Sequence, residues 1–124
     1  MTDQLSPVQI ETKLRSLVNQ LTQAQGALAQ ARDAETDAEV ELKRERIRAA
    51  HSPQCPKPAR GSVTVAEREA WIDEQVAGAW EVHRRAVTAR EIAQDHLRTL
   101  RDQASVVQSL GSSVRTAYGM AGVS

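Results

Sequence analysis

A chain of 124 residues has the length of a single domain. Its 16 basic and 16 acidic residues cancel, which argues against a nucleic-acid-binding protein that works by overall positive charge. Its one cysteine excludes an intramolecular disulfide and fits a reducing compartment. Phenylalanine is absent and the aromatic residues are Trp71, Trp80 and Tyr118, so long helices packed along a narrow seam are expected rather than a core of large aromatic side chains.

The amino-terminal stretch MTDQLSPVQIETK lacks the basic and apolar regions of a signal peptide. No apolar run approaches the ~18 residues that a membrane-spanning helix needs. We therefore expect a cytoplasmic protein that does not insert into a membrane.

The first expected helix covers residues 7–50. Ser6 and Gln9 have the spacing of a capping box, and Leu5 and Ile10 have the spacing of a hydrophobic staple. The helix should end near residue 50, because Ser52 precedes a proline. Two heptad columns run along it, one formed by Leu14, Leu21, Leu28, Glu35, Leu42 and Ala49 and the other by Ile10, Leu17, Ala24, Ala31, Ala38 and Glu45. The apolar pattern is regular to about residue 31 and weakens beyond it.

Residues 51–63 form the expected turn, which contains the stretch HSPQCPKPARGS. His51 and Cys55 could begin a metal site, but His83 and His96 lie far along the next helix. We therefore expect no metal and no cofactor, and we interpret Cys55 as an incidental thiol in an exposed loop.

The second expected helix covers residues 65–110. Thr64 and Glu67 have capping-box spacing. Apolar residues then recur at strict seven-residue spacing, at Val65, Ile72, Ala79, Ala86, Ala93, Leu100, Val107 and Val114. His83 and Arg90 fall in the companion column, where polar residues more often set register than catalyse a reaction.

The two helices match as antiparallel partners. Folding the chain about residue 57 places residue i opposite residue 114 − i, so that Leu28 faces Ala86 and Leu21 faces Ala93. Large residues then meet small ones, and the basic run 43–48 meets the acidic residues 67–73. The expected fold is an all-α, coiled-coil-like antiparallel helical hairpin in one domain, 1–124. A single pair of helices with so much alanine is marginally stable, so we expect it to dimerise into a four-helix bundle.

A C-terminal tail, residues 111–124, completes the expected fold. Gly111 and Gly119 are candidate helix ends. The tail either folds back as a short third helix or docks onto a partner. The expected interface with a partner or a second copy combines the tail with apolar residues off the seam: Trp71, Trp80, Val87, Val106, Val107, Leu110, Val114 and Tyr118.

A basic patch surrounds the turn, formed by Lys43, Arg44, Arg46, Arg48, Lys57 and Arg60. Such a patch could contact phosphates. The facing helix start is acidic, however, and no aromatic residue interleaves the patch to stack on bases. Paired or solvated charge is the expected state, and nucleic-acid binding is an alternative.

Known catalytic motifs are absent: the chain has no P-loop, no GxSxG, no HExxH and no glycine-rich dinucleotide turn. We therefore predict no catalytic residues and no enzymatic activity.

Two families of small helical proteins bear on the function. Membership of the secreted WxG-type hairpin family is excluded, because the turn lacks Trp-x-Gly and Tyr118 is not followed by the acidic residue of that family's secretion signal.

The stretches TVAEREAWIDEQV and HLRTLRDQASVVQSLGSSVRTAYG resemble small helical proteins encoded by bacteriophages, particularly those of actinobacteria, over about half of the chain. That resemblance implies an accessory role beside phage DNA replication or recombination, or on a host protein, inside the bacterial cell. We therefore predict a non-enzymatic protein-interaction module; the alternatives are a nucleic-acid-binding accessory factor and a virion structural or scaffolding component.

Overall fold

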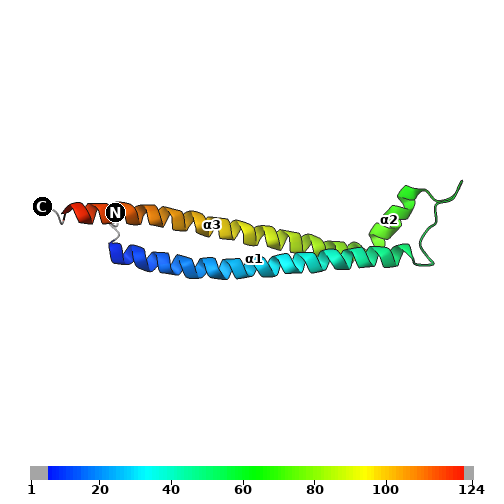
Figure 1. Ribbon diagram of the computed structural model, residues 1–124. Coiled ribbons are helices and arrows are strands. Elements are labelled where there is room, and N and C mark those ends of the chain that lie inside the picture. Colours follow the sequence, from blue (N-terminus) through cyan, green and yellow to red (C-terminus); the bar gives the residue numbers. More distant parts are fainter. Residues whose placement is uncertain (1–5, 122–124) are drawn as a thin grey trace. The chain divides into compact units, whose positions relative to one another are not determined.

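The computed structural model describes residues 6–121, and the fold is all-α. It consists of α1 (Pro7–Ala50), α2 (Val65–Gln75) and α3 (Ala77–Ala121), joined as a helical hairpin (Figure 1). Within the described residues, extended structure is limited to a single bridge between Pro58 and Val63. The predicted fold class is confirmed.

The chain divides into two compact units, where the sequence predicted one domain. Unit 1 combines residues 1–29 with 92–124, and unit 2 is the continuous segment 30–91.

Local sequence signals set the helix starts. At α1 the Ser6 amide donates to Gln9 Oε1 at 2.8 Å, and the Gln9 amide donates back to Ser6 Oγ at 3.2 Å, so the predicted capping box forms. At α2 the Glu67 amide donates to Thr64 Oγ1 at 3.1 Å. The predicted staple involves Leu5, which lies outside the described residues.

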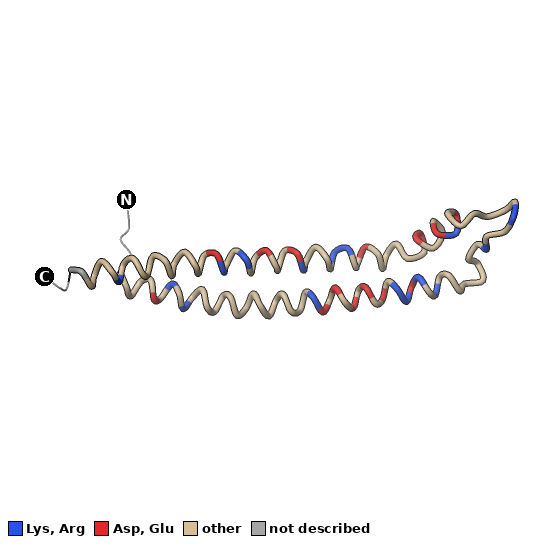
Figure 2. The backbone as a smooth tube through the Cα atoms, turned by 45° about the horizontal axis from the view of Figure 1, so that its top comes forward, with Lys and Arg blue, Asp and Glu red and all other residues tan. Residues whose placement is uncertain are grey.

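In unit 1, the first part of α1 and the second part of α3 lie antiparallel, side by side (Figures 1 and 2). Their buried seam is formed by Ile10, Leu17, Ala24, Leu28, Leu97, Leu100 and Val107. No described side chain in this unit is less than 2% exposed. Two helices thus share one thin core, in which most of the seam residues are the predicted heptad residues.

The register of unit 1 differs from the prediction. A Cβ added to Gly111 would lie 3.2 Å from Ile10 Cγ2, so residue i lies level with about 121 − i rather than 114 − i. The difference is one heptad. The symmetric fold about residue 57 assumed that both helices run straight to the turn, whereas the second one bends before reaching it.

That bend is at Val76, where the sequence predicted an uninterrupted helix over 65–110. Val76 has φ −101° and ψ 11°, and α2 points away from the direction of α3 (Figure 1). The Val76 amide still donates to the Ile72 carbonyl at 3.1 Å, and the Val76 carbonyl accepts from the Trp80 amide at 2.8 Å. Ile72 and Val76 are each 3% exposed, so the side chains on both sides of the break are buried in unit 2.

The C-terminal segment also differs from the prediction. Helix α3 continues through Gly111 and Gly119 to Ala121, so the described part of the tail 111–124 is not a separate helix that folds back. Gly61 has the one positive φ among the described glycines. Gly111 therefore does not cap the helix with left-handed backbone; it lets α1 approach closely.

Candidate interaction surfaces

The thiol in the turn of unit 2 is buried. Cys55 is 6% exposed, and its Sγ lies 3.7 Å from the Pro56 carbonyl oxygen. The expectation of an exposed loop thiol is wrong, because the cysteine side chain is buried. Gly61, at φ 82°, supplies the left-handed backbone that the turn needs. Residues 6–121 contain no group of three or more His, Cys, Asp or Glu placed to hold a metal ion.

Half of the basic patch is engaged in ion pairs. Arg46 donates to Asp73 at 2.6 Å and to Glu69 at 3.0 Å, as the predicted meeting of basic and acidic runs required. Its hydrogen bond to Asp73 raises the arginine's pKa, opposed by burial. The other engaged members pair along α1, Lys43 with Glu39 and Arg48 with Glu45.

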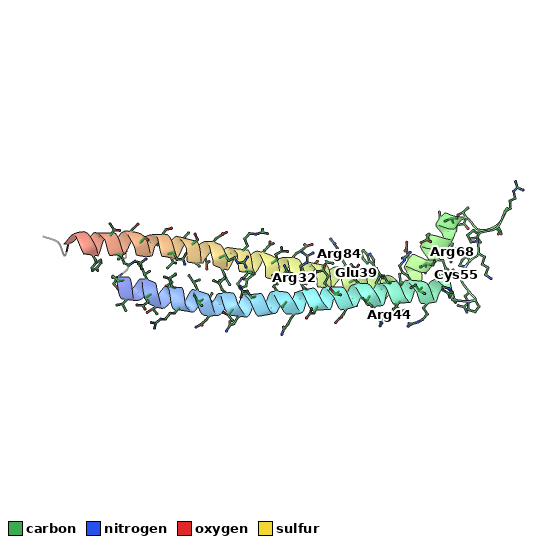
Figure 3. All side chains as sticks on the ribbon, in the orientation of Figure 1. Arg32, Glu39, Arg44, Cys55, Arg68 and Arg84 are labelled. Atoms are coloured by element: carbon green, nitrogen blue, oxygen red, sulfur yellow. The ribbon has the colours of Figure 1, made fainter. Side chains whose placement is uncertain are left out.

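The other half of the patch is exposed and unpaired. Arg44, Lys57 and Arg60 make no ion pair within the described part of the chain. All three are exposed. Arg44 projects from α1 (Figure 3), and Lys57 and Arg60 belong to the turn between α1 and α2. Their charges are therefore available to solvent or to an anionic partner.

A second ionic contact in unit 2 crosses between helices. Arg90 on α3 donates through Nε to Glu35 Oε2 at 2.9 Å and through a terminal nitrogen to Oε1 at 3.4 Å. This hydrogen bonding lowers the pKa of Glu35, against the opposing effect of burial; the charges of Arg90, His83 and Arg32 lower it further. The sequence pattern places Arg90 in the seam but does not identify Glu35 as its partner, because the assumed pairing sets Arg90 opposite residue 24.

The lowered pKa of Glu35 predicts an acid-dependent loss of stability. A depressed carboxyl pKa stabilises the fold above its unfolded value of about 4.3 and stops doing so as the pH falls through the folded pKa. Glu35→Gln should lower the urea midpoint at pH 7 and flatten its decline between about pH 5 and 3. Urea titrations at each pH test this, with exposed Glu11→Gln as the control. A wild-type decline that Glu35→Gln leaves unchanged would contradict the assignment.

The predicted interface residues fall into three groups. Trp80 (56%), Val106 (60%), Leu110 (44%) and Tyr118 (60%) are exposed, whereas Trp71, Val87 and Val114 are half-buried. Val107 is 5% exposed within the core of unit 1, and Val114 packs against that core. Val107 and Val114 therefore hold the two helices together and do not form an outer surface. Both belong to the apolar column with strict seven-residue spacing, and that spacing indicates a position between the two helices.

An uncharged surface lies on α1 in unit 1. No charged residue occurs between Arg15 and Arg32, and Figure 2 shows this stretch as an uninterrupted tan section of the helix. We define the uncharged surface by the exposed residues of this stretch that lie in unit 1: Ser16, Val18, Asn19, Gln20, Thr22, Gln23, Gln25, Gly26, Ala27 and Ala29. Immediately beyond it, from Arg32 to Arg48, charged residues are frequent.

Among the shallow grooves of unit 1, two lie beside the seam and contain exposed valines. The Val18 groove is lined by Glu11, Leu14, Arg15, Val18 and Asn19. The Val106 groove is lined by Lys13 from α1 and by Thr99, Asp102, Gln103, Val106, Val107 and Leu110 from α3. Lys13 and Val18 are about 140° apart around α1, with the core-facing Leu14 and Leu17 between them. The grooves therefore lie on opposite sides of the seam.

Comparisons of the chain with protein-family models, with curated proteins and with solved structures gave no match. None of the described helices is long and apolar enough to cross a membrane.

Proposed function

We propose that the protein is a non-enzymatic interaction module, and that the uncharged surface of α1 binds a helix of a partner protein. The supporting observation is the absence of charge from a row of exposed positions that begins at Val18, which is 58% exposed. The role beside phage DNA metabolism, which the sequence resemblance implies, is part of the same proposal.

The chemistry of this surface suits burial. Taking a charged side chain out of water is costly unless it is paired, whereas an amide can satisfy its hydrogen bonds across an interface. Charged residues are accordingly depleted at the centres of protein interfaces. On the side of α1 that carries Val18, Gly26 has no neighbouring side chain within 4 Å of where its Cβ would be, and Ala29 is also small. A partner helix could therefore approach this face closely.

Comparative affinity capture tests the proposal. The intact chain and one double variant, which carries both Val18→Lys and Gln25→Lys, serve as baits in the cell that produces the protein. We expect one partner protein whose recovery falls about tenfold or more with the variant, because each lysine must be desolvated on binding. Ile47→Lys is the matched control, since Ile47 is 61% exposed but lies in unit 2. Equal recovery with all three baits would contradict the proposal.

Nucleic-acid binding at the turn is a second candidate, favoured by the unpaired charges of Arg44, Lys57 and Arg60. Binding to single- and double-stranded DNA at two salt concentrations separates it from the first, because phosphate contacts weaken steeply with salt. No binding at low salt would eliminate it, and salt-dependent binding that the triple alanine variant abolishes would support it.

A further inference from the structure

The Val106 groove has the features of a surface that binds its own copy. Val106 and Leu110 are 60% and 44% exposed within it. Lys13 and Asp102 line the same groove, and neither makes an ion pair within the described part of the chain. The groove thus combines an apolar strip with one available positive charge and one available negative charge.

We infer that this groove is the interface of a homodimer with a two-fold axis near Val106. A two-fold interface presents the same patch twice, so the patch must be complementary to itself. A patch with one charge of each sign meets this condition when the axis lies midway between them, because each Lys13 then faces the Asp102 of the other copy.

The register of unit 1 places the axis. Ile10 lies level with Gly111, so Lys13 lies level with about residue 108 of α3. Asp102 is six residues away along α3, about 9 Å at 1.5 Å per residue. Val106 lies close to the middle of that interval. The axis that pairs the charges therefore also brings the two Val106 side chains together.

The thin core of unit 1 gives this arrangement an energetic reason. Helices generally bury their apolar stripe between two packed layers, and unit 1 has one layer of two helices. A second copy stacked on the Val106 groove would bury Val106 and Leu110 and give unit 1 the four-helix packing of a bundle. The inference rests on the proposed function in treating unit 1 as an interaction module, but it uses the opposite groove.

Sedimentation equilibrium at low salt, with helix content checked by circular dichroism, tests the inference. We expect the wild-type chain to dimerise and Val106→Lys to abolish dimerisation, since two ammonium groups would meet at the axis. Lys13→Glu and Asp102→Lys should each weaken the dimer about tenfold, because each places like charges across the interface twice. The double variant Lys13→Glu, Asp102→Lys should recover most of that loss. Val18→Lys, with the same chemical change on the opposite side of the seam, should dimerise like wild type.

Three results would overturn the inference: a monomeric wild type at concentrations up to about 1 mM, a Val18→Lys effect equal to that of Val106→Lys, or a charge-swapped double variant no better than its single variants. A monomeric chain that still loses its partner through Val18→Lys would overturn the dimer and leave the proposed function standing. A chain that dimerises but captures no partner would leave the dimer inference standing and contradict the proposed function.

Discussion

Leu100→Ala is expected to lower the free energy of unfolding by about 2–4 kcal/mol. Leu100 is 3% exposed and belongs to the single buried cluster of unit 1. Truncation removes the transfer free energy of three carbon atoms and leaves a cavity, and so thin a core has few neighbours to fill it. Because small domains are stable by only about 5–15 kcal/mol, this loss is a large fraction of the total.

Urea titration followed by circular dichroism measures the effect of Leu100→Ala. Ile92→Ala is the control, since it removes the same number of carbon atoms from the same helix at a position that is 64% exposed. Its cost should be within about 1 kcal/mol. Similar losses for the two variants would show that α3 does not pack on α1 through Leu100.

Gly111→Val is expected to destabilise the protein by about 1–3 kcal/mol, although valine is a better helix former than glycine. A Cβ at this position already lies 3.2 Å from Ile10 Cγ2, and valine adds two further methyl groups. The clash must therefore push α1 away from α3 or force a strained rotamer.

A double-mutant cycle shows whether the cause of the Gly111→Val effect is contact with Ile10. Adding Ile10→Ala should cost less in the Gly111→Val background than in wild type, because the truncated side chain leaves room for the valine. Gly26→Val is the control for helix propensity, since nothing lies within 4 Å of its added Cβ. Strict additivity of the two substitutions would contradict the close approach at Gly111.

The parts of the fold that depend on local chemistry could be predicted from the sequence. The capping box at Ser6 and Gln9, the cap at Thr64 and the end of α1 at Ala50 each depend on a few neighbouring residues. The heptad columns likewise identified most of the buried seam, including Val107.

The register could not be predicted in the same way. A heptad pattern shifted by seven residues keeps the same residues in the seam, so the columns alone cannot distinguish 114 − i from 121 − i. The choice depends on where the second helix bends, and no proline marks the break at Val76. Gly111 was misread for a related reason: a glycine near the end of an expected helix suits a cap and a close helix contact equally well.

The candidate surfaces were only partly visible in the sequence. The apolar residues predicted to form an interface include Val106 and Leu110, which are exposed, but also Val107, which is buried. The gap in charge between Arg15 and Arg32 is plain in the sequence, yet it gains meaning only when the structure shows those positions to be exposed. The pairing of Glu35 with Arg90 required the correct register.

Site-specific photocrosslinking from Gln25 tests the central claim most directly. Gln25 is exposed and lies two helical turns beyond Val18, in the same heptad position. A benzophenone side chain placed there, in the protein expressed in its own cell, should form a covalent adduct with a distinct partner polypeptide. The same group at Glu41, exposed in the charged part of α1 within unit 2, should not. A partner adduct that forms from Glu41 and not from Gln25 would contradict the assignment of the uncharged surface as the binding site.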